Sequence, residues 1–154
     1  MATRSKFIPK TGDVIKTRSG RYCIIANSLN LDDLLLYNIL PVSLAIYMAS
    51  DKDFIIMDDD VFDKIPVMAE LWNSLAVPIE FFDTVKKVGK LNPQYTQYLS
   101  SYLYFNFQNR KNRELEILTG PPITSSSDIR LLFRQMEEKA FYSIRTVLIN
   151  ISTE

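Results

Sequence analysis

The chain has 154 residues, 47% of them hydrophobic, which suffices for one domain with its own core. It contains no histidine and one cysteine, so the commonest general base and metal ligand is missing, and an internal disulfide or a multi-cysteine zinc site is excluded. Its 18 basic and 18 acidic residues cancel, and a neutral chain lacks the broad basic field that drives non-specific nucleic-acid binding. We expect no metal and no cofactor.

The chain carries no sign of membrane insertion or export. No stretch reaches the ~18 uninterrupted apolar residues of a membrane-spanning helix. Residues 1–10 lack the apolar centre of a signal peptide. We therefore expect a cytoplasmic protein without a membrane partner.

Charge is unevenly distributed along the chain. Residues 1–22 hold six basic residues and one acidic residue, a net charge of +5, while residues 23–83 hold two basic and eleven acidic residues, a net charge of −9. Residues 86–154, with ten basic and six acidic residues, return to +4. If these segments lie on opposite faces, a focused phosphate-binding surface is compatible with a neutral total.

The first half of the chain has the pattern of short strands joined by turns. Apolar runs at 14–17 and 22–26 flank Ser19-Gly20 and predict a hairpin. A polar stretch over 27–33 separates this hairpin from further apolar runs, at 34–40 (before Pro41), 44–48 and 54–57. Strands at this spacing favour a small barrel.

The second half turns helical. Residues 67–71 after Pro66 predict a helical turn, and residues 75–82 predict a strand. Asn92 and Pro93 are typical of a helix start, and tyrosines at helical spacing extend that helix over 93–105. These tyrosines and the basic residues after them also resemble a base-stacking platform, although their spacing favours packing.

A connector over 106–126 precedes a final amphipathic helix over 127–150, which Ser127 caps. We expect the apolar stripe of this helix to pack on the barrel. Its members are Ile129, Leu132, Phe133, Met136, Ala140, Ile144 and Val147.

Three segments in order resemble the first half of a PemK/MazF-type toxin: Gly12-Asp13-Val14-Ile15, then Gly20-Arg21-Tyr22-Cys23-Ile24-Ile25-Ala26-Asn27, then Ile39-Leu40-Pro41-Val42-Ser43. Residues 74–88 are similar to a later strand of that family, and the match spans residues 8–90. The family has a small SH3-like β-barrel with C-terminal helices. The resemblance therefore implies a mainly β (α+β) fold, with the barrel and helix 93–105 in residues 1–105.

Active members of that family cut single-stranded RNA without a metal, by driving the ribose 2′-hydroxyl onto the adjacent phosphate. The resemblance places Arg21 at the catalytic arginine and Ser43 at the catalytic threonine or serine. A guanidinium binds phosphate oxygens in pairs, and a hydroxyl donates to the same developing charge. The resemblance also implies RNA contacts from Lys16, Arg18, Lys86 and Lys87, and a homodimer or an antitoxin as protein partner.

Some features depart from the family. Tyr22 stands where the family has proline after the arginine, the middle of the chain is acidic, and the C-terminal extension is long. These departures favour an alternative: a non-catalytic PemK-like module that binds a protein in a bacterial defence or regulatory complex. Ordinary structural roles for Arg21 and Ser43 stay open. Cys23 is expected to be a buried, inert thiol, and Asp60 to cap a turn.

Overall fold

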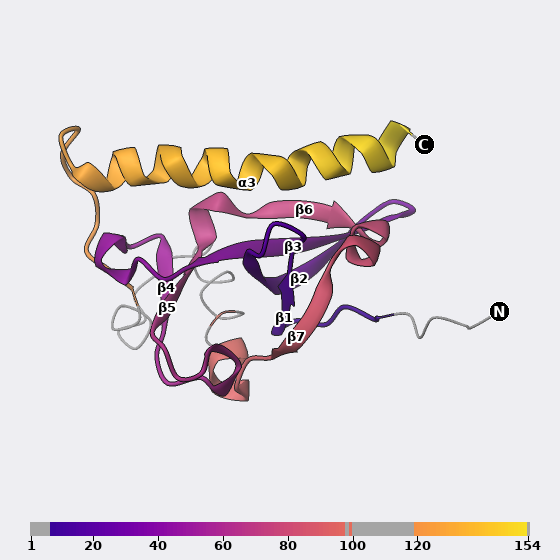
Figure 1. Ribbon diagram of the computed structural model, residues 1–154, viewed down its shortest axis with the longest axis horizontal. Helices are drawn as coiled ribbons and strands as arrows, with labels where there is room; N and C mark the ends of the chain where they lie inside the picture. The colour runs from indigo at the N-terminus through magenta and orange to yellow at the C-terminus, as the bar shows by residue number, and fades with distance from the viewer. Residues whose placement is uncertain (1–6, 98, 100–118, 154) are drawn as a thin grey trace.

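The computed structural model describes residues 7–97, 99 and 119–153 (Figure 1). Within them lie seven strands: β1 (Asp13–Lys16), β2 (Tyr22–Leu31), β3 (Leu34–Ser43), β4 (Asp53–Ile56), β5 (Val67–Glu70), β6 (Leu75–Pro78) and β7 (Lys86–Lys90). The 3₁₀ helices are η1 (Ile46–Met48), η2 (Asp60–Phe62), η3 (Leu71–Asn73) and η4 (Ile79–Thr84), and the long helix is α3 (Ile129–Thr153). The mainly β, α+β class predicted from the sequence is confirmed.

The strands form one antiparallel sheet in the order β4-β5-β3-β2-β1-β7, with β6 paired to β3 outside this path. Two strands pair with the edge of β3 that faces away from β2: β6 pairs with residues 36–39, and β5 pairs with residues 42–43. Pro41, which has no N–H to donate, falls in the gap between the two partners. Among the described residues no pairing joins β4 to β7, so the sheet is open and the expected closed barrel does not form.

The β2–β3 hairpin is longer than predicted. The polar residues 27–31, expected in a loop, continue β2, and Leu31 pairs with Leu34 across a two-residue turn. Asp32 supplies the positive φ, 57°, that such a turn requires. Nearer the core, the register shifts at a bulge between Ile25 and Asn27.

The register of this hairpin is marked by an amide pair. Asn27 lies opposite Asn38, and Asn38 Nδ2 donates to Asn27 Oδ1 at 2.9 Å. Each side chain satisfies a polar group that would otherwise lie unpaired beside the apolar part of the sheet.

The central strands are buried on both faces, which explains their continuous apolar runs. Ile24 and Leu40 belong to one core cluster, with Phe54, Tyr95 and Leu99. Their neighbours in the strands belong to the other cluster, which contains Cys23, Ile25, Ile39, Phe81 and Phe141. The helical residues 93–97 and 99 thus cover one face, while η4 and α3 cover the other.

Two local predictions are wrong. Residues 67–70 form β5, not a helical turn, because they pair with both β3 and β4. The strand predicted over 75–82 ends at Pro78, after which η4 follows. The predicted helix 93–105 is helical at 93–97 and 99, and its remainder lies outside the described residues.

The end of the predicted connector contacts β4. Thr119 forms a bridge with Phe54, and Gly120 N donates to Ser50 O at 2.9 Å. From there the chain rises to α3, which runs across the sheet above β6 and β3 (Figure 1). Its first turn is capped by Asp128, whose Oδ1 accepts from Arg130 N, not by the predicted Ser127.

Candidate functional site

Arg21 lies at the end of the β1–β2 turn and reaches toward the end of β3. The turn is closed by Thr17 N donating to Arg21 O and by Gly20 at a φ of +89°. The Arg21 side chain is 22% exposed, and its Nε donates to Val42 O at 2.9 Å. This bond holds the guanidinium beside the residue that precedes Ser43.

The terminal nitrogens of Arg21 are taken up by two carboxylates. Arg21 NH1 and NH2 donate to the two oxygens of Glu137, on α3, at 3.2 and 2.5 Å. Arg21 NH2 also lies 3.5 Å from Glu70 Oε1, at the end of β5. We call these three residues the Arg21 cluster. It joins the hairpin, the sheet and the helix.

The two carboxyl groups of the Arg21 cluster have pKa values shifted in opposite directions. Glu70 is fully buried, and this burial, together with the hydrogen bond to Glu137 and the negative charge of Glu137, raises the pKa of Glu70 to about 9. The positive charge of Arg21 acts in the opposite direction and lowers it. Burial opposes the charged form of Glu137, but hydrogen bonds with Glu70 and Arg21 lower its pKa. The raised pKa of Glu70 and the lowered pKa of Glu137 favour the negative charge on Glu137, which pairs with Arg21.

Ser43 ends β3 and is half-buried. Its Oγ accepts from Ala45 N at 3.1 Å, so the hydroxyl supports the turn that leads to η1. The described polar contacts of the Arg21 side chain go to Val42, Glu70 and Glu137. The two predicted catalytic residues thus lie close along the sheet, but both are engaged in structural contacts.

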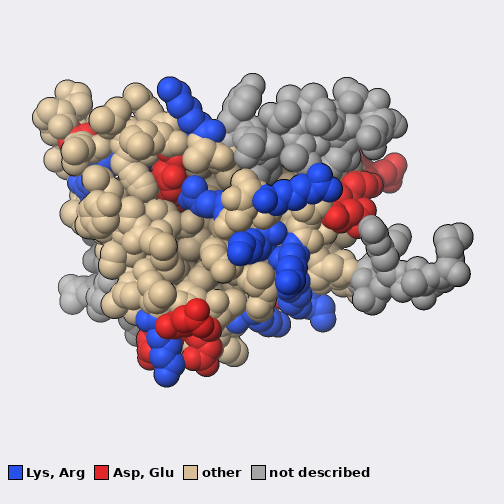
Figure 2. Space-filling view, in the orientation of Figure 1, with Lys and Arg blue, Asp and Glu red and all other residues tan. Residues whose placement is uncertain are grey.

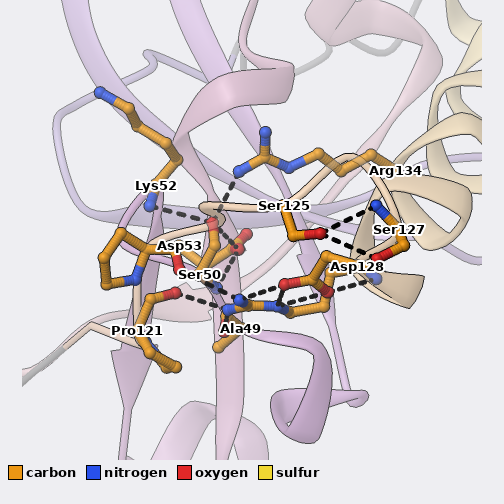
Figure 3. Close-up of polar contacts among 11 residues, drawn as sticks. Ala49, Ser50, Lys52, Asp53, Pro121, Ser125, Ser127, Asp128 and Arg134 are labelled. Carbon is orange, nitrogen blue, oxygen red and sulfur yellow. Dashed lines mark hydrogen bonds and ion pairs between the residues drawn. The ribbon is translucent and has the colours of Figure 1, made fainter.

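Two arginines attach the start of α3 to the segment between η1 and β4 and to the connector. Arg130 NH1 donates to Ala49 O and Pro121 O at 2.9 and 2.5 Å, and Arg134 NH2 donates to Ser50 Oγ at 2.7 Å (Figure 3). The contacting side of the helix repeats at helical spacing through Arg130, Arg134, Glu137 and Phe141.

Three residues of the predicted apolar stripe of this helix are exposed to solvent. Ile129, Leu132 and Met136 are 64%, 58% and 65% exposed. The expected docking of this stripe is therefore wrong at these positions. Charged side chains occupy the buried side because they find backbone carbonyls, Ser50 and Arg21 as partners.

The four residues predicted to contact RNA come together on β1, β7 and the turn after β1. Lys16 lies directly opposite Lys86 in the β1–β7 pair, and Ile15 lies opposite Lys87. Figure 2 shows basic side chains gathered over the part of the molecule where β1 and β7 lie in Figure 1. We define the β1–β7 patch as the exposed residues Lys16, Arg18, Lys86, Lys87 and Lys90.

Acidic residues neutralise little of the β1–β7 patch. Lys87 Nζ lies 3.4 Å from Oδ1 of the buried Asp13, and also over the Phe7 ring. Lys16 instead places its Nζ 5.6 Å from the centre of the Tyr22 ring. Like charges directly opposite each other in a sheet are destabilising, so the Lys16–Lys86 pair carries a cost that a bound anion would remove.

Sequence reasoning missed Glu70 and Glu137. Glu70 directly follows the apolar residues 67–69, and a carboxylate in that position indicates a charged group next to the core. Glu137 lies at the border of the apolar stripe, four residues after Phe133, and amphipathicity assigns a charged residue at this border to solvent. The contact between Glu137 and Arg21 joins residues 116 positions apart in the chain, so no local pattern indicates it.

Two other predictions concern reactive or metal-binding groups. Cys23 is buried as expected, and burial raises its pKa to about 12. Asp59, not the predicted Asp60, caps η2 through Val61 N. The described residues contain no group of three or more carboxylates or thiols placed to hold a metal ion.

No helix in the described part of the chain combines the length and the apolar character that crossing a bilayer requires. Comparison with protein-family models, with curated proteins and with solved structures finds no match for this chain.

Proposed function

We propose that this chain binds single-stranded RNA through the β1–β7 patch, as a PemK/MazF-like protein whose SH3-like sheet has remained open. The observation that carries the proposal is the pairing of Lys16 with Lys86 across two adjacent strands of a neutral protein, with the exposed residues Arg18, Lys87 and Lys90 in the same two strands and the turn after β1. Such a focused patch supplies the phosphate contacts that dominate nucleic-acid affinity. The resemblance over residues 8–90, which contains all seven described strands, supports RNA as the ligand.

Single strands fit this surface better than a duplex. The β1–β7 pair is short, four and five residues, and the aromatic Tyr22 adjoins it. A strand with unpaired bases can place phosphates on the lysines while a base contacts an aromatic ring.

Salt dependence tests this proposal. Four of the five patch residues have no described ion pair with an acid, and four phosphate contacts give a slope of log K against log salt of about −2.8, at ~0.7 per contact. Lys86→Gln should make the slope less steep, about −2.1, whereas Lys139→Gln, the same charge change at an exposed residue of α3, should leave the slope unaltered. Fluorescence anisotropy of a labelled RNA dodecamer between 50 and 200 mM salt measures both. Equal slopes for the two variants would rule out the patch as the binding surface.

The second candidate is metal-independent RNA cleavage by Arg21 and Ser43. One observation favours it: Arg21 binds both oxygens of Glu137 with its two terminal nitrogens, as an arginine binds a phosphate. In the described arrangement Glu137 holds those nitrogens, so cleavage would require α3 to release them.

Cleavage assays on Glu137→Gln and on the double variant Arg21→Ala/Glu137→Gln separate the two candidates. If Arg21 stabilises the transition state, the first variant cuts single-stranded RNA without added metal, and the second is at least ~100-fold slower. Equal, measurable rates in the two variants would exclude Arg21 as the catalytic group, and no cleavage by either would leave RNA binding without cleavage.

A further inference from the structure

A small apolar pocket adjoins the β1–β7 patch. Its volume is about 180 Å³, and its wall is formed by Tyr22 at the start of β2, Val42 and Leu44 at the end of β3, and Val61 and Phe62 of η2. Pockets for drug-sized ligands measure ~300–1,000 Å³. This one therefore admits a single ring system, not a larger ligand.

Tyr22 connects the pocket to the patch. The rings of Tyr22 and Phe62 pack in a T-shaped arrangement, with centroids 6.0 Å apart and planes at 87°. The Lys16 ammonium lies 5.6 Å from the same ring, and the side chain of Tyr22 is 37% exposed. A cation that binds phosphate thus lies beside an aromatic wall that is open to stacking.

The pocket beside Tyr22 is distinct from the Arg21 cluster, although the two residues are adjacent in the chain. Arg21, its neighbour in the chain, contacts β3, β5 and α3, whereas Tyr22 contacts Lys16 and η2. The pocket and the Arg21 cluster are therefore separate features that share only Val42, through its carbonyl on one side and its lining position on the other.

We propose that this pocket is a nucleobase subsite, which takes one unstacked base of the single-stranded RNA whose phosphates lie on the β1–β7 patch. The inference rests on the proposed RNA-binding function. A base has apolar faces that suit the aliphatic and aromatic wall, and its own phosphate is held within reach of Lys16. The positive charge at the rim selects an aromatic ring carried by an anion over a neutral apolar peptide.

Asp63 adds a polar group to the lining of the pocket. It has a φ of 54°, and Lys64 follows at 61°, so two successive residues adopt the left-handed conformation beside the pocket. A carboxylate accepts hydrogen bonds from N–H groups. The Asp63 carboxylate can therefore accept a hydrogen bond from an N–H group of the bound base, either an exocyclic amino group or a ring N–H.

Two RNA octamers of equal charge test the subsite by anisotropy. One consists of abasic ribose phosphates, and the other carries a single adenine at its centre. Stacking of one base contributes ~1–3 kcal/mol, so the adenine should tighten binding to the wild-type protein at least about fivefold. Tyr22→Ala should bring this ratio to about one, while Tyr22→Phe should preserve it.

Further variants guard against an effect of misfolding. Leu44 is 70% exposed, so Leu44→Asp should leave the fold intact. By placing a negative charge at the pocket rim, it should also bring the ratio of the two affinities to about one. Lys86→Gln should weaken both octamers by the same factor and leave the ratio unchanged. If the wild-type protein binds both octamers equally, the subsite is wrong and RNA binding by the patch stands. If it binds neither, the proposed function itself is wrong.

Discussion

The pairing of Arg21 with Glu137 can be measured by a double-mutant cycle. The perturbations are Arg21→Ala, Glu137→Ala and their combination, each assayed by urea unfolding at pH 7. Two hydrogen bonds between charged groups join the side chains, at 2.5 and 3.2 Å, and their exposed fractions are 22% and 14%. Hydrogen bonds to charged groups contribute about 1.5–3 kcal/mol each, less when they share one helix-docking event. We expect a coupling energy of about 2 kcal/mol.

The two single variants should differ in cost. Glu137→Ala leaves Arg21 beside Glu70, which can then ionise and take over the pairing. Arg21→Ala leaves two adjacent carboxylic groups with no cation, so it should be the more destabilising of the two. Lys139→Ala, on the exposed side of α3, serves as the control and should change the unfolding free energy by less than ~0.5 kcal/mol. A coupling below ~0.5 kcal/mol, the usual limit of additivity, would refute a structural role for the pair.

Three further predictions concern Glu70, Gly120 and Cys23. Glu70 has a pKa of about 9 in the folded protein and near 4.5 in the unfolded chain. Its contribution to the free energy of unfolding is therefore fully present below pH ~4.5 and is lost as the pH rises to about 9, by up to ~1.4 kcal/mol per pH unit. Glu70→Gln should remove this loss, so the stability of the variant relative to wild type, measured by urea titration, should increase with pH. Gly120→Ala would place a Cβ 2.2 Å from Ala49 O, so we expect a loss of roughly 2 kcal/mol or more in thermal unfolding; unchanged stability would contradict this packing. Cys23, buried and with its pKa raised to about 12, should react with iodoacetamide only after unfolding in guanidinium chloride, and rapid labelling of the native protein would contradict its burial.

The sequence predicts the elements whose causes are local. The β1–β2 hairpin follows from Gly20, which takes the positive φ of the turn between two apolar runs. The final helix follows from its periodicity and from a cap within one residue of the predicted position. Residues 67–70 show the opposite case. Pro66 suggests a helix start, but pairing on both sides with β3 and β4 decides their conformation.

The candidate site divides in the same way. Basic residues near both ends of the resembling segment predict a phosphate-binding surface, and the Lys16–Lys86 register joins them. Amphipathicity identified α3 as a helix but not the face that it buries. That choice depends on Ser50, Ala49 and Arg21, which lie at least 80 residues away in the chain and are invisible to any local pattern.

The double-sided burial of β2 bears on how accurately the hairpin folds. A slip of one residue normally exposes apolar side chains and buries polar ones. In the segment 23–26 it would only exchange two sets of apolar residues between the two cores, so hydrophobic burial barely distinguishes the correct alignment from its nearest error. The amide pair of Asn27 and Asn38 makes that distinction, since misalignment would force both amides against aliphatic neighbours without a partner. Fidelity of strand alignment thus depends on two polar side chains at the margin of an otherwise interchangeable apolar ribbon.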